Sequence, residues 1–83
     1  MISIKDIMQA NNAKIKDFGK FRTNNSYWSK PRVFPYAILL KNKDTSFFIY
    51  FRKDISSNDF SKIVTERKVY TNRFGMLVFK QED

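Results

Sequence analysis

Residues 33–53 read VFPYAILLKNKDTSFFIYFRK and decide the fold, because two apolar runs flank a short polar segment. Both runs, 33–41 and 46–53, are rich in aromatic and branched side chains, which predicts two β-strands. The segment between them, 42–45, has the composition of a hairpin turn. The second run is apolar on both faces, which predicts a central strand covered on both sides. Pro35 indicates that the first strand starts beside an edge or a bulge.

The segment before this hairpin predicts a helix at the N-terminus. Ser3 and Asp6 have the spacing of a capping box with an acidic third residue. Apolar side chains then recur at spacings of three, four and seven residues, as on one face of a helix. We therefore expect a short amphipathic helix over residues 4–13.

A third strand is predicted over residues 16–23. Phe18 and Phe21 are three residues apart, and a bulge at Gly19 would bring both rings to one face of the sheet. The next residues, 24–32 (NNSYWSKPR), are polar and contain a proline, which predicts a loop.

The segment after the central hairpin predicts a second helix and a second hairpin. Serine and asparagine residues that are candidate N-caps precede a helix expected near residues 58–66. Two strands, 68–71 and 76–80, should then be joined by a loop in which Gly75 takes a positive φ.

These elements predict the α+β class in a single domain, residues 1–83. The expected order is α-β-β-β-α-β-β: an antiparallel sheet of about four to five strands with two short helices. Six phenylalanines are expected to supply most of the core of this short chain: Phe18, Phe34, Phe47, Phe51, Phe60 and Phe79.

Charge and composition limit the classes of function. Sixteen Lys and Arg against eight Asp and Glu give a formal net charge of +8. The chain has no cysteine and no histidine, which excludes disulfides, thiolate zinc sites and imidazole catalysis. The aspartates are scattered, and no nucleotide-binding or hydrolase motif is present. We therefore expect a protein that is not an enzyme, with no metal and no cofactor.

The sequence also favours a cytoplasmic protein that does not enter a membrane. The longest apolar run, Val33–Leu40, is far shorter than the ~20 residues of a membrane-spanning helix. The first residues lack the basic start and long apolar region of a secretory signal.

The positive charge instead predicts a nucleic-acid partner, most specifically RNA. Two segments, 20–32 and 67–74, interleave cations with aromatic rings. Cations neutralise phosphates, and aromatic faces stack on unpaired bases. If the two segments meet in one positive face, the nucleic-acid-binding residues are Lys20, Arg22, Tyr27, Trp28, Lys30, Arg32, Arg67, Lys68, Tyr70 and Arg73.

Other interpretations remain open at this point. Tyr27 and Trp28 are equally consistent with a place in the core, and the cations with a solvated loop. A basic surface also suits an inhibitor that docks on an acidic host protein, and a homodimer would bury more surface. A toxin-like RNase is a further alternative, in which cations stabilise the phosphorane and a Tyr or Lys moves protons; its candidates are Tyr27, Arg32, Lys68, Tyr70 and Arg73.

The chain as a whole resembles the small, basic early proteins of T4-like bacteriophages. The resemblance is carried by its length, its charge and its Lys/Asn/Phe-rich composition, as in residues 11–12, 24–25 and 41–43. In size and charge it is similar to the phage RNA-binding inhibitor of the ToxN endoribonuclease. The resemblance implies a non-enzymatic protein that binds RNA and blocks a host defence system, and it assigns no residue. It would equally imply an anti-CRISPR or another host-takeover factor.

Overall fold

The computed structural model describes residues 2–20 and 34–81, which form two helices and five strands. Their order is α1 (Ile4–Asn11), β1 (Lys14–Lys20), β2 (Tyr36–Lys41), β3 (Ser46–Phe51), α2 (Ser57–Glu66), β4 (Val69–Thr71) and β5 (Leu77–Phe79). This is the predicted order, and the α+β class is confirmed. The predicted loop 24–32 and Phe21 lie outside the described residues.

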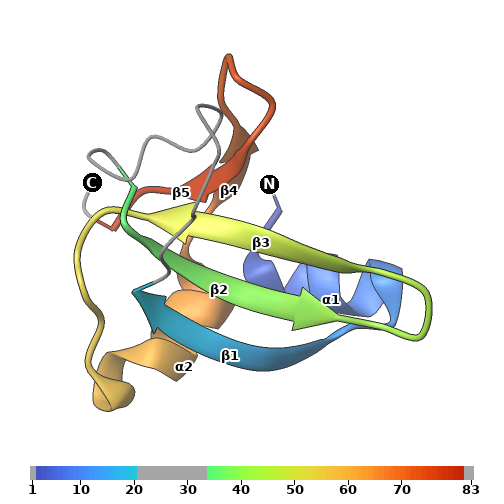
Figure 1. Cartoon of the computed structure of the whole chain (residues 1–83). Coiled ribbons are helices and arrows are strands. Elements are labelled where there is room, and N and C mark those ends of the chain that lie inside the picture. Colours follow the sequence, from blue (N-terminus) through green and yellow to red (C-terminus); the bar gives the residue numbers. More distant parts are fainter. Residues whose placement is uncertain (1, 21–33, 82–83) are drawn as a thin grey trace.

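The strands form one sheet in the order β1-β2-β3-β5-β4 (Figure 1). Strand β3 is central, as its apolar sequence predicts. The pairs β1–β2, β2–β3 and β4–β5 are antiparallel. β3 and β5 run parallel, with Ile49 opposite Leu77 and Tyr50 opposite Val78. This parallel pair makes the sheet mixed, which the sequence analysis did not anticipate, and it brings the carboxyl ends of β3 and β5 to the same edge of the sheet.

Helix α1 begins at the predicted capping box. The Ser3 side-chain oxygen accepts a hydrogen bond from the Asp6 N–H (3.1 Å), and the Asp6 carboxylate accepts one from the Ser3 N–H (3.0 Å). The bond from the Ser3 backbone lowers the pKa of Asp6 below its ordinary value of 3.8. The helix ends at Asn11, before the predicted residue 13, because Asn12 adopts a left-handed conformation with φ 50° that stops it.

Helix α2 rests on the sheet through its apolar side. Its N-cap is Ser56, whose side chain accepts a hydrogen bond from the Asp59 N–H (3.3 Å). The ring of Phe60 stacks on Phe18 of β1 with 4.1 Å between centroids and 17° between planes. Both helices lie on the same face of the sheet (Figure 1). Neither of these two described helices has the length and apolar character needed to cross a membrane.

The bulge in β1 lies nearer the start of the strand than predicted. The register with β2 shifts between Ile15 and Asp17, not at Gly19. The bulge still serves to bring two apolar side chains three residues apart to one face of the sheet, but the pair is not Phe18 and Phe21. Ile15 and Phe18 are three residues apart, and one extra residue between them lets both face the helices.

The core lies between the sheet and the two helices. Ile38, Leu40, Ile49 and Phe51 are fully buried there, and Phe79 is 3% exposed. The remaining expected core phenylalanines, Phe18, Phe47 and Phe60, pack against this cluster while partly exposed.

Phe34 does not join the core cluster, which corrects the prediction for that ring. Its half-buried side chain precedes β2 and lies under the guanidinium of Arg52, whose Cζ is 5.6 Å from the ring centroid. The position is explained by where β2 starts, because Tyr36 takes the first core position of the strand and stacks on Phe51 at 5.4 Å.

The second face of the sheet is partly covered. Ala37 and Val78 are fully buried on this face, whereas Phe48 is 37% exposed and Tyr50 is half-buried. The rings of Phe48 and Tyr50 contact each other in a tilted arrangement with 5.9 Å between centroids. Burial raises the pKa of Tyr50 above its ordinary value of 10.0.

The β2–β3 turn is stabilised by its first residue. The side-chain oxygen of Asn42 accepts hydrogen bonds from the N–H groups of Asp44 (2.9 Å) and Thr45 (2.8 Å). The Asn42 N–H also donates to the Thr45 carbonyl (3.0 Å). The predicted hairpin turn over residues 42–45 is therefore confirmed.

Candidate nucleic-acid interface

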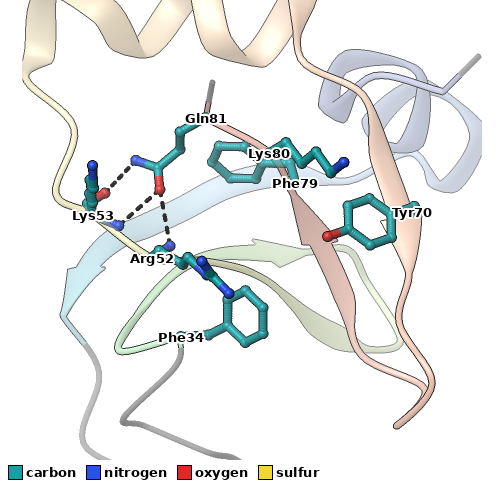
Figure 2. Close-up of a pocket in the computed structure, with 7 residues that line it drawn as sticks. All are labelled: Phe34, Arg52, Lys53, Tyr70, Phe79, Lys80 and Gln81. Carbon is teal, nitrogen blue, oxygen red and sulfur yellow. Dashed lines mark hydrogen bonds between the residues drawn. The ribbon is translucent and has the colours of Figure 1, made fainter. Parts of the chain in front are cut away.

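A hollow of about 460 Å³ lies beside the carboxyl ends of β3 and β5, which meet at one end of the sheet because these two strands are parallel. Figure 2 shows this strand-end hollow and the described residues that line it: Phe34, Arg52, Lys53, Tyr70, Phe79, Lys80 and Gln81. Three of these residues are cations, and none is acidic. The charge is local because Arg52 and Lys53 directly follow β3, and Lys80 directly follows β5.

Gln81 joins the two strand ends. Its side-chain oxygen accepts hydrogen bonds from the N–H groups of Arg52 (3.0 Å) and Lys53 (2.8 Å). Its amide nitrogen donates to the Lys53 carbonyl (2.6 Å). These bonds pair backbone groups just beyond β3, where the ladder with β5 has ended, and they position the two cation-bearing residues.

Aromatic rings stand beside the cations in the strand-end hollow. Arg52 and Phe34 lie together on one side, and Tyr70 of β4 faces them with its hydroxyl directed into the hollow (Figure 2). Tyr70 is 40% exposed, so part of its ring remains accessible. The site therefore presents hydrogen-bond donors and ring faces together, the combination that binds phosphates and unpaired bases.

Lys20 lies at the same end of the sheet as this hollow but is not among the described residues that line it. It is the exposed last residue of β1, opposite Tyr36, at the other edge of the sheet from β4. Tyr36 in turn pairs with Phe51 at the end of β3, so two strand spacings of ~4.8 Å, about 10 Å, separate the backbone of Lys20 from the strand end that forms the hollow. Five further predicted residues lie outside the described part of the chain, and their role stays a prediction: Arg22, Tyr27, Trp28, Lys30 and Arg32.

The second predicted segment is divided among three places. Tyr70 lines the strand-end hollow, and Arg73 lies on the β4–β5 turn with its Cζ 5.1 Å from the Phe74 ring centroid. Arg67, the C-cap of α2, and Lys68 line a separate hollow of about 340 Å³, here called the helix-end hollow. The structure thus does not gather Lys68, Tyr70 and Arg73 as the RNase alternative would require.

The helix-end hollow is less suited to a polyanion. It lies between the start of α1 and the end of α2, and Asp6 and Glu66 line it together with its cations. Its charges are therefore mixed, whereas the described lining of the strand-end hollow carries only positive charge.

The sequence analysis did not select the cations of the strand-end hollow. In the sequence, Arg52 and Lys53 stood at the end of the predicted strand 46–53, and Lys80 at the end of the predicted strand 76–80. What was missing was the parallel pairing, which alone tells that these two strand ends meet. Comparison with known proteins adds no assignment, because no protein-family model, curated protein or solved structure matches the chain.

Proposed function

We propose that this protein binds single-stranded RNA in the strand-end hollow. The observation that carries the proposal is that three cations, Arg52, Lys53 and Lys80, line the same hollow as the exposed ring of Tyr70. The volume of about 460 Å³ falls within the ~300–1,000 Å³ of small-molecule pockets, a size that suits one nucleotide at a time.

The chemistry divides between charge and stacking. The guanidinium of Arg52 offers several N–H donors in one plane, which suits the oxygens of a phosphate, and the lysines add point charge. The Tyr70 ring offers a face for an unpaired base, and its hydroxyl can donate to or accept from a ribose 2′-hydroxyl. The overall charge of +8 attracts the strand from a distance.

We propose binding, not catalysis, as the activity. The sequence provides no histidine to activate a hydroxyl, and the three RNase candidates that the structure describes, Lys68, Tyr70 and Arg73, lie in separate places. Because the chain resembles the phage inhibitor of ToxN in size and charge, we propose that the RNA binding serves to block a host toxin endoribonuclease. Co-expression with such a toxin should restore growth, and a variant with a disabled hollow should not.

Anisotropy titration of a fluorescein-labelled oligouridylate tests the binding proposal. The logarithm of affinity should fall by about 0.7 per decade of salt for each phosphate neutralised in a single strand. The double variant R52Q/K80Q removes two cations, so this slope should become shallower by about 1.4.

The matched control is Lys43→Gln. Lys43 is an exposed lysine in the β2–β3 turn, at the opposite end of β3 from the hollow. The Lys43→Gln variant should bind RNA with almost the affinity of the wild type and with the same salt slope. Binding that ignores salt, or an R52Q/K80Q protein that behaves like the Lys43→Gln control, would overturn the proposal.

A further inference from the structure

The β4–β5 turn is closed by its own hydrogen bonds and lies at the tip of a hairpin that projects away from the rest of the sheet (Figure 1). The side-chain oxygen of Asn72 accepts hydrogen bonds from the N–H groups of Phe74 (2.9 Å) and Met76 (3.0 Å). The Asn72 N–H donates to the Met76 carbonyl (2.9 Å), and the Gly75 N–H donates to the Asn72 carbonyl (3.0 Å). Gly75 permits this geometry with φ +80°, a conformation that other residues rarely adopt.

This turn presents an aromatic ring and a cation. Phe74 is 53% exposed, although a ring of this size stabilises a fold best when it is buried. The guanidinium of Arg73 lies 5.1 Å from the ring centroid, within the range of a cation–π contact. Because the turn is already held by hydrogen bonds, a ligand that contacts the ring loses little free energy in ordering it.

The neighbourhood identifies the ligand as a nucleic-acid strand. Tyr70, which lines the strand-end hollow, is on the same hairpin, and the rise of ~3.3 Å per residue places Asn72 about 7 Å further along. Stacked nucleotides advance by ~3.4 Å each, so this distance corresponds to about two nucleotides. An RNA strand that stacks one base on Tyr70 can therefore reach the β4–β5 turn with a base a few nucleotides further along.

We infer that Phe74 is a second base-stacking platform and that Arg73 binds the adjacent phosphate. The site then takes a continuous run of unpaired nucleotides that extends from the strand-end hollow to the hairpin tip. This inference rests on the proposed function, since it extends the same RNA site. It identifies the preferred ligand as a single strand several nucleotides long, because bases inside a duplex are stacked on their neighbours and leave no face open to the ring.

Length-dependent binding tests the inference. Titrations with a uridine dinucleotide and a uridine decanucleotide should be compared for the wild type and Phe74→Leu, which keeps an apolar side chain but removes the ring. The variant should bind the decanucleotide about 5- to 150-fold more weakly, the equivalent of one stacked base, and the dinucleotide as the wild type does. Phe74→Tyr should keep the decanucleotide affinity of the wild type because it keeps an aromatic ring at this position.

Two further measurements separate the possible failures. The salt slope of Phe74→Leu should equal that of the wild type, whereas Arg73→Gln should lose about 0.7 of the slope. Unchanged decanucleotide affinity in Phe74→Leu would overturn this inference. That result is also the one expected if Phe74 instead anchors a protein partner. If R52Q/K80Q still weakens binding in that case, the proposed function survives; if the wild type binds no RNA, the proposed function itself fails.

Discussion

Gln81→Met tests whether the join between β3 and β5 organises the site. Methionine has nearly the length of glutamine but can neither accept from the N–H groups of Arg52 and Lys53 nor donate to the Lys53 carbonyl. The substitution therefore removes all three hydrogen bonds that connect the end of β5 to the end of β3, while it changes the side-chain volume little.

The expected loss of stability follows from these bonds. A protein hydrogen bond contributes about 0.5–1.5 kcal/mol net, and near the surface water can replace part of it. Three bonds at the lower end of that range amount to roughly 1.5 kcal/mol, or a fall in Tm of about 6–12 °C for a domain of this size. A stability of about 5–15 kcal/mol would leave the protein folded.

RNA affinity should fall as well. Once the backbone of Arg52 and Lys53 is released, it must be ordered again when RNA binds. Ordering either one of these two residues costs about 1–2 kcal/mol, so binding should weaken by at least about 5- to 30-fold. The salt slope should stay unchanged, since no cation is lost.

Guanidinium chloride unfolding and RNA anisotropy measure the two effects. Gln81→Glu provides a contrast, because its carboxylate still accepts from both N–H groups but adds negative charge beside the cations. It should keep more stability than Gln81→Met and still lose affinity. Gln9→Met, at an exposed position on α1, is the control. A Gln81→Met protein as stable and as tightly binding as this control would refute the reasoning.

Three other predictions concern the fold. The folded-state pKa of Asp6 is lowered, so its contribution to stability is present above about pH 3.8 and is lost as the pH falls through the folded-state value. An NMR titration of its carboxyl should show this lowered pKa, and Ser3→Ala should raise it in part, because a hydrogen bond with the Ser3 side chain, the second cause after the backbone bond, is lost. The stacked rings of Phe18 and Phe60 should show a coupling of about 0.5–1.5 kcal/mol in a double-mutant cycle with leucine, measured by denaturant unfolding. Gly75→Ala should destabilise the fold by roughly 1–2 kcal/mol, because alanine is strained at a φ of +80°. No steric clash adds to this cost, since no atom lies within 4 Å of the new Cβ. An unchanged thermal unfolding midpoint would contradict this prediction.

Local signals in the sequence predicted most of the fold. The capping box at Ser3 and Asp6 and the polar turn at 42–45 act within a few residues, so their geometry can be inferred from spacing alone. The bulge shows where such reasoning reaches its limit. A spacing of three between apolar residues correctly indicated an extra residue in β1, but two pairs had that spacing, and only the register with β2 shows that Ile15 and Phe18 are the pair that faces the core.

The candidate site was less predictable because it depends on a pairing between distant strands. Arg52 and Gln81 are 29 residues apart in sequence, and a hairpin-based prediction pairs each strand with its neighbour along the chain. Strand β5 instead lies between β3 and β4, parallel to the first and antiparallel to the second. Alternation along β4 separates Tyr70 from Val69, yet it could show neither which of the two is exposed nor which cations would stand beside Tyr70.

The contact that closes the sheet also builds the site. Gln81 completes the junction of β3 and β5, and through the same bonds it orients the residues proposed to bind phosphate. A ligand that binds the folded state alone stabilises that state by mass action, by about 2.7 kcal/mol at a concentration of 100 Kd. Occupation of the strand-end hollow therefore stabilises the end of the chain that forms it, and loss of the junction weakens binding and stability together.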